Sequence, residues 1–213
     1  MTIQKILGLF IFCGVFSAQQ QMSSLTVEQF RDQPLPVRIV GAQLSTFQYT
    51  SELSAQISTD AASEPISANM MLLIYRNGKV VSGEGWTEEK PTNSLHRQTK
   101  LAFAPGDHAL LMVRSVKTRS GIMQLKPQDM NDAIKALTQG TLPRLPSVEL
   151  SMLPNLPHAK VQRVQGAYCT TCYNTASSAC GVAGVQSFSC DDKNQNFSFT
   201  CKGNTPVQPP PVN

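Results

Sequence analysis

Five cysteines fall within a short stretch near the C-terminus of this 213-residue chain, which has one other cysteine, Cys13. The five are Cys169, Cys172, Cys180, Cys190 and Cys201. The residues between them are mostly Thr, Ser, Asn, Gly and Asp with isolated aromatics, so the stretch has little apolar side chain from which to build a core. We therefore expect residues 166–203 to form a small disulfide-rich module that is stabilised by cross-links more than by burial.

Two disulfides would use four of these five cysteines and leave one thiol over. Cys169 and Cys172 are crowded at the edge of the stretch, so we expect one of them to be unpaired, although the spacing does not determine the connectivity. An unpaired cysteine in a secreted protein can bond to a second chain. A disulfide-linked homodimer is therefore one expected partner arrangement.

Two other uses of the Cys169-x-x-Cys172 pair are disfavoured. A redox pair would need a strand–helix unit of thioredoxin type around it, and Thr170 and Thr171 are poor residues with which to begin a helix. A zinc site would need a second close pair of soft ligands, which is missing from the stretch. We predict no metal and no cofactor.

The N-terminus is typical of a secretory signal peptide. Lys5 precedes an apolar or small-residue run from Ile6 to Phe16, and the small residues Ser17 and Ala18 precede a glutamine run. The run is shorter than the roughly 20 residues that span a bilayer, so a membrane anchor is disfavoured. A lipoprotein reading of Cys13 is also disfavoured, because bulky Phe12 precedes it. We expect residues 1–18 to be removed, and the mature protein to be extracellular and free of the membrane.

Charge gives a second constraint on partners. The formal net charge is +4 and charged residues make up 15% of the chain, with no run of Lys and Arg. A phosphate-binding stripe is therefore missing, and nucleic acid is not an expected partner.

Residues 36–140 carry the patterns of a β-rich domain. Apolar residues alternate with polar ones over 37–44 and 46–57, which predicts two half-buried strands. The apolar runs 70–75 and 79–81 flank Asn77-Gly78, the pair best suited to a type I′ hairpin turn. A second hairpin is predicted to join 99–103 with 109–113, and the charged, proline-containing segment 87–97 is expected to be a surface loop.

One helix is predicted from Gln128 to Thr138. Its apolar stripe lies at i, i+3, i+4 and i+7, with Pro127 before its start and Gly140 after its end. The stripe consists of Met130, Ala133, Ile134 and Leu137. The fold class expected is mainly β, an antiparallel β-sandwich-like domain with one packed helix, followed by the small disulfide-rich module.

Three further segments connect or flank these parts. We expect residues 19–35 to be a flexible lead-in, because they are polar with sparse apolar residues. The motif L-P-x-L-P occurs twice within residues 141–165, and it predicts a proline-rich strap or linker. Residues 204–213 are predicted to be a disordered proline-rich tail.

Catalysis is not expected from this sequence. The available bases are His96, His108 and His158, and neither a Gly-x-Ser-x-Gly elbow nor a His-Glu-x-x-His motif accompanies them. His108 follows Asp107 directly, and neighbours on a strand point to opposite faces. We therefore predict that the protein is not an enzyme.

The function expected is that of a secreted structural or interaction protein, such as a component of an extracellular matrix, coat or eggshell-like assembly. The alternative is an extracellular binding module for a carbohydrate or a protease, lectin-like or inhibitor-like, so the partner would be an extracellular protein or a polysaccharide. Aromatic side chains of the cysteine-rich module would then face the ligand. They are Tyr168, Tyr173, Phe188, Phe197 and Phe199. The sequon Asn196-Phe197-Ser198 predicts glycosylation at Asn196 in a eukaryotic host.

Overall fold

The computed structural model describes residues 23–29, 35–47, 50–104, 106–126, 148–152 and 166–203, together with Asp132, Lys135 and Ala136. Eleven strands, the α-helix α2 and two single 3-10 turns have their bounds in these ranges. The first strands are β1 (Ser23–Gln29), β2 (Val37–Phe47), β3 (Thr50–Thr59), β4 (Ser67–Arg76), β5 (Lys79–Glu89) and β6 (Ser94–Thr99). The remaining elements are β7 (His108–Lys117), β8 (Gly121–Leu125), β9 (Val148–Met152), α2 (Ala167–Cys180), β10 (Val185–Asp191) and β11 (Asn196–Cys201).

The strands form two sheets that share β1. Sheet A has the order β1-β2-β3-β6, and sheet B has the order β10-β11-β5-β4-β7, with β8 and β9 continuing beyond β7. The first half of β1 pairs antiparallel with β2, and its second half, Val27–Gln29, pairs parallel with β7. All other pairings are antiparallel. The fold is thus a mainly β, sandwich-like arrangement, as predicted.

The hairpin between β4 and β5 has the turn that its sequence predicts. Asn77 and Gly78 have φ values of 49° and 71°, both in the left-handed region that a type I′ turn requires. Arg76 pairs with Lys79 across this turn. The tight turn therefore sets the register of the central pair of strands in sheet B.

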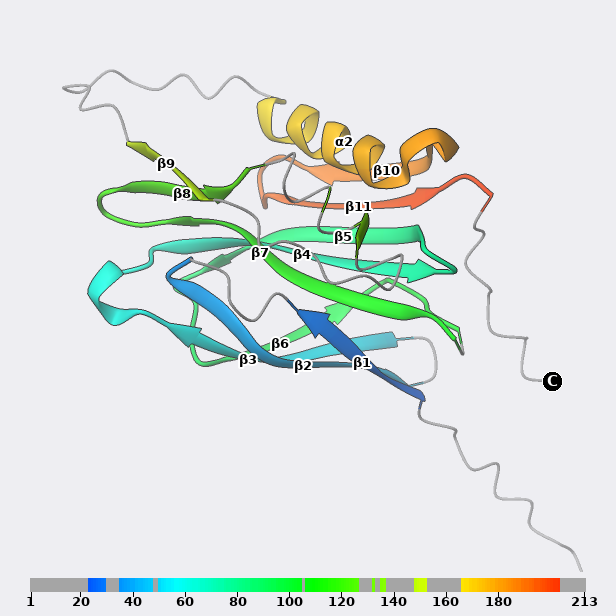
Figure 1. The fold of residues 1–213 in the computed structure, drawn as a ribbon, viewed down its shortest axis with the longest axis horizontal. Helices are drawn as coiled ribbons and strands as arrows, with labels where there is room; N and C mark the ends of the chain where they lie inside the picture. Colours follow the sequence, from blue (N-terminus) through cyan, green and yellow to red (C-terminus); the bar gives the residue numbers. More distant parts are fainter. Residues whose placement is uncertain are drawn as a thin grey trace, which may run out of the picture.

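The central strands of sheet B are buried on both faces. Every residue from Met70 to Tyr75 on β4 is buried, as is every residue from Ala109 to Val113 on β7. On β3 in sheet A, buried and exposed residues largely alternate instead. The continuous apolar runs of β4 and β7 match burial on both faces. In Figure 1, α2 lies along the β10–β11 side of sheet B, and β2, β3 and β6 lie on the far side.

The cysteine-rich segment extends the sandwich. β11 pairs with β5, placing Phe197 opposite Gly85 and Phe199 opposite Gly83, and β10 then forms the edge of sheet B. Both phenylalanines belong to the same core as the sandwich strands. The segment is poor in apolar residues by itself, and it obtains a core by sharing the glycine-lined face of β5.

Several segments differ from the sequence-based expectation. β1 lies within 19–35, where a flexible lead-in was expected; it pairs with both sheets, and its Val27 is buried. Segment 87–97 was expected to be a loop, yet it holds the end of β5 and most of β6. The hairpin expected around residue 105 is missing, because Leu101–Ala104 form no strand.

Other predicted segments fall partly or wholly outside the described residues. Of the predicted helix at 128–138, only Asp132, Lys135 and Ala136 are described, and they are helical. The helix described as packing on the sheet is α2, which the sequence did not predict. Within 141–165 the described part is β9, which pairs with β8. Segments 1–18 and 204–213, predicted as signal peptide and tail, lie outside the described residues.

Candidate functional site

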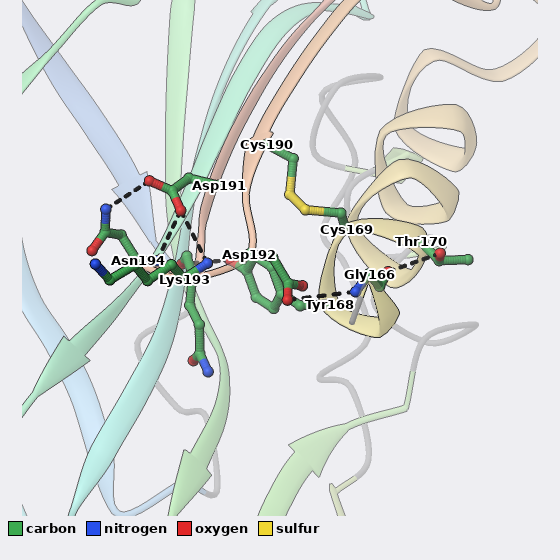
Figure 2. The surroundings of a disulfide bond; sticks show 10 residues. Gly166, Tyr168, Cys169, Thr170, Cys190, Asp191, Asp192, Lys193 and Asn194 are labelled. Carbon is green, nitrogen blue, oxygen red and sulfur yellow. Dashed lines mark hydrogen bonds between the residues drawn. A yellow bond between two sulfur atoms is a disulfide. The ribbon is translucent and has the colours of Figure 1, made fainter. Parts of the chain in front are cut away.

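Two disulfides fix α2 to sheet B at both of its ends. Cys169 in the first turn bonds to Cys190 on β10, and Cys180 at the last residue bonds to Cys201 on β11. Figure 2 shows the first bond beside Tyr168 and the turn that joins β10 to β11. The helix is therefore covalently attached to the sheet near both of its ends.

Cys172 is the cysteine that these two bonds leave over. It is 1% exposed and lies on the sheet-facing side of α2, in line with buried Ala176 and Cys180. The predicted homodimer needs an exposed thiol, and Cys172 does not provide one in this conformation.

A cavity of about 390 Å³ lies beside α2, between the helix and sheet B. One wall is a stripe of polar side chains along the helix, spaced i, i+3, i+4 and i+7. These are Thr171, Asn174, Thr175 and Ser178. The rest of the lining comes from Asn69, Met70, Trp86, Arg114, Ser115, Gln124, Leu125, Tyr168, Cys172 and Phe197. The cavity thus combines a polar helical wall with a wall of mixed apolar and polar residues from the sheet.

Arg114 is the charged residue of this lining. It comes from β7, at the irregularity in pairing where β4 passes from Asn69 to Met70. Its Nη2 donates to Thr175 Oγ1 at 3.0 Å, while its Nε is buried without a hydrogen-bond acceptor in the described part of the chain. Burial lowers the pKa of the Arg114 guanidinium, which nevertheless stays charged at neutral pH because an arginine pKa starts so high.

Cys172 and Tyr168 are the ionisable neighbours of Arg114, and both remain neutral. Burial raises the pKa of the Cys172 thiol, and its hydrogen bonds with Tyr168 and Arg114 only partly offset this effect. Burial also raises the pKa of the Tyr168 phenol, which donates to the Gln195 carbonyl at 2.5 Å. A protonated thiol is a weak nucleophile, so Cys172 is not activated for covalent catalysis.

A hydrogen-bonded network connects one side of the cavity to the β10–β11 turn. Asn69 Nδ2 donates to Ser115 Oγ at 2.8 Å and Asn69 Oδ1 accepts from Thr87 Oγ1 at 2.7 Å. Thr87 Oγ1 also lies 3.1 Å from Oε1 of Gln195, whose carbonyl binds Tyr168. These bonds link β4, β5, β7 and α2, which makes this side of the cavity a fixed surface.

The predicted ligand-facing aromatics do not share one exposed face. Phe197 and Phe199 are buried, with 4% and 2% of their surface exposed, and Tyr168 and Phe188 are half-buried. Tyr173 is 48% exposed and meets Phe188 edge-on, with ring centroids 5.3 Å apart. The two phenylalanines of β11 are core residues because they cover Gly85 and Gly83 of β5. Asn196, the predicted glycosylation site, is the half-buried first residue of β11.

The predicted candidate bases do not build a catalytic dyad in the described residues. Nδ1 of exposed His96 lies 3.3 Å from Ser54 Oγ and 3.8 Å from Glu52 Oε1. A serine triad uses opposite ring nitrogens for these two partners, whereas here both approach the same one. His108 stacks on Tyr75 at 5.1 Å, and His158 lies outside the described residues.

Sequence reasoning missed the residues that matter most at this cavity. Arg114 carried a signal, because it is a lone charge within the apolar strand Ala109–Val116. The polar stripe of α2 also has helical spacing, but it becomes visible only when the segment is taken as a helix.

Comparisons with protein-family models, with curated proteins and with solved structures give no match for this chain. The two intramolecular disulfides indicate an oxidising environment of the extracellular type. Among the described residues, no helix is long and apolar enough to cross a membrane. No group of three or more His, Cys, Asp or Glu side chains in the same ranges could hold a metal ion.

Proposed function

We propose that this chain is a secreted, non-catalytic binding protein that holds a small molecule in the cavity beside α2. The cavity is the observation that carries the proposal. Its volume of about 390 Å³ lies within the range of about 300–1,000 Å³ that is typical of ligand pockets. Its lining is more polar than is usual for such pockets, and it combines apolar residues with many polar groups that can orient a ligand.

Rigidity of the cavity supports the same proposal. Disulfides hold both ends of α2, and the network through Asn69 and Thr87 holds the opposite side. A site that is already ordered loses less conformational entropy when a ligand binds. This arrangement favours a preformed site over one that is created by the ligand.

Secretion completes the proposal. The predicted signal peptide at residues 1–18 and the two disulfides point to the same compartment. In a eukaryotic host, Asn196 would carry a glycan within its sequon.

The two functions expected from the sequence receive less support. A cross-linked matrix or coat component was inferred from a thiol available to other chains, and the thiol of Cys172 is buried. A carbohydrate or protease site built on aromatics would need Phe197 and Phe199 at the surface, and both are core residues. We therefore keep ligand binding as the proposed class of function. We place the ligand in the cavity beside α2 instead of on the aromatic side chains of the cysteine-rich module.

Trp86 gives a direct test, because it is the only tryptophan and it lines the cavity. A panel of amino acids, organic acids, sugars and nucleotides would be titrated against the protein while Trp86 emission is recorded. At least one compound should change the emission, and Ser178→Phe should abolish the response by filling the cavity. Ser177→Phe is the matched control, because Ser177 is exposed on α2, as Ser178 is, but does not line the cavity. A panel without any response, or a Ser178→Phe protein that still responds like Ser177→Phe, would contradict the proposal.

A further inference from the structure

We infer that the molecule held beside α2 is a small organic anion whose carboxylate, or an equivalent oxyanion, pairs with Arg114. This inference rests on the proposed function and names its ligand class. It is argued from the partners of the arginines, from the charges around the cavity and from the donors that its lining leaves unused.

The first argument compares Arg114 with Arg76 and Arg97, the two other partly buried arginines among the described residues. Arg76 Nε donates to Asp107 at 2.5 Å, and Arg97 Nε donates to Glu84 at 2.9 Å, each carboxylate being almost fully buried. Arg114 has no Asp or Glu within ion-pair distance in the described part of the chain. Its hydrogen-bond partners are the neutral hydroxyl of Thr175 and the neutral thiol of Cys172. Within the described residues, the fold therefore supplies carboxylates to Arg76 and Arg97 but none to the arginine in the cavity.

The second argument concerns the groups around Arg114. Cys172 and Tyr168 share its surroundings and are neutral at pH 7, because burial keeps both protonated. The charge of Asp192 acts on Cys172, but Asp192 forms no ion pair with Arg114. Within the described residues, the positive charge of the cavity is therefore not neutralised by direct contact with a carboxylate. A buried charge without a partner is unfavourable, and a bound anion would remove that penalty.

The third argument comes from unused donors. Two of the residues that line the cavity, Arg114 and Trp86, each have a buried N–H group, Nε and Nε1, without an acceptor in the described part of the chain. Buried donors are normally paired, so a ligand rich in acceptors would satisfy these groups if the side chains turn toward the cavity. A carboxylate provides acceptors and negative charge together, and arginine recognises it in preference to neutral groups.

The test uses two probes of nearly the same shape, 1-naphthoate and 1-naphthamide, which differ in charge. Calorimetric titration should show that naphthoate binds about tenfold or more tightly than naphthamide, as a charge-assisted hydrogen bond predicts. Arg114→Met should remove this preference, and Arg114→Lys should keep most of it. Ser178→Phe should weaken the binding of both probes.

A separate measurement distinguishes ligand recognition from a structural role of Arg114. Without ligand, Arg114→Met should unfold at the same temperature as the wild type or higher, because it removes a buried charge that no carboxylate neutralises. Marked destabilisation of Arg114→Met, with Arg114→Lys restoring the stability, would assign the residue to the fold and overturn the inference.

The probe results also separate the two proposals. If both probes bind with similar affinity and Arg114→Met leaves both unchanged, the site exists and the anion inference is wrong. If neither probe binds to the folded protein, the inference is also contradicted. The proposed function fails as well only if the broader panel leaves Trp86 emission unchanged.

Discussion

Phe197 on β11 covers Gly85 on β5 so closely that a Cβ atom added to the glycine would collide with the phenylalanine ring. The same relationship repeats two residues along the strands, where a Cβ on Gly83 would lie 2.6 Å from the Phe199 ring. The two rings are also stacked, with centroids 6.3 Å apart. The glycines of β5 are therefore what allows the cysteine-rich segment to join sheet B.

Gly85→Ala should destabilise the protein by about 1–3 kcal/mol, because the added methyl group overpacks a filled core. The measurement is the free energy of unfolding from urea denaturation. Gly41→Ala is the matched control on β2, since the nearest atom to its added Cβ would be Gln56 Oε1 at 4.0 Å. Equal stability of the two variants would show that Phe197 does not lie over Gly85.

Asp107 should be one of the most important polar residues for stability. Its side chain is 1% exposed and accepts from Arg76 at 2.5 and 2.9 Å and from the Ala104 amide at 2.8 Å. Asp107→Asn breaks the ion pair and leaves Arg76 without its carboxylate, which should cost about 2–4 kcal/mol. Urea denaturation measures this loss.

A surface ion pair gives the control for Asp107. Glu64 and Arg119 lie 2.7 Å apart, but both side chains are more than half exposed. Glu64→Gln should therefore change the free energy of unfolding by less than about 1 kcal/mol. An Asp107→Asn protein as stable as Glu64→Gln would mean that the buried pair is not formed.

Stability should fall at alkaline pH because of Cys172. Its pKa is raised in the folded protein above the ordinary thiol value of 9.0, so the unfolded chain loses the thiol proton first as pH rises. The contribution of the protonated Cys172 thiol to the free energy of unfolding is complete below pH 9, and it is lost as pH rises through the pKa of the folded protein. Unfolding free energies measured from pH 7 to 10 should therefore decrease, and Cys172→Ala should reduce the slope.

Tyr168 explains why Cys172→Ala should not remove the whole alkaline effect. Its pKa is also raised above an ordinary value of 10.0, and the sign of its contribution is the same. The unfolding free energies of wild type and Cys172→Ala should consequently begin to diverge about one pH unit below the pH at which Tyr168 lowers the stability of both proteins. Identical slopes from pH 8.5 upward would show that the thiol of Cys172 is not buried.

Local sequence signals predicted the sandwich well where they were strong. Asn77-Gly78 specified its hairpin, and the apolar runs on either side became buried strands of sheet B. β1 and β6 were missed because their pairing partners lie far away in the chain, and short mixed sequences acquire strand structure from such partners.

The candidate site was harder to predict for a physical reason. α2 is built largely from Thr, Ser, Cys and Asn, which are weak helix formers, and it begins at a glycine without a side-chain cap. Cys169–Cys190 and Cys180–Cys201 stabilise it instead, and the spacing of cysteines does not reveal such pairings. Without α2, the stripe from Thr171 to Ser178 and its proximity to Arg114 cannot be seen in the sequence.

A crystal structure of the protein grown with 1-naphthoate would test the central claim most directly. The account predicts α2 fixed by Cys169–Cys190 and Cys180–Cys201, with the naphthoate carboxylate within hydrogen-bonding distance of Arg114 in the cavity beside Thr175. Electron density for naphthoate in the cavity, with its carboxylate away from Arg114, would contradict the anion inference. An empty cavity with naphthoate bound elsewhere would also contradict the anion inference, and an α2 that does not lie on sheet B would contradict the proposed site itself.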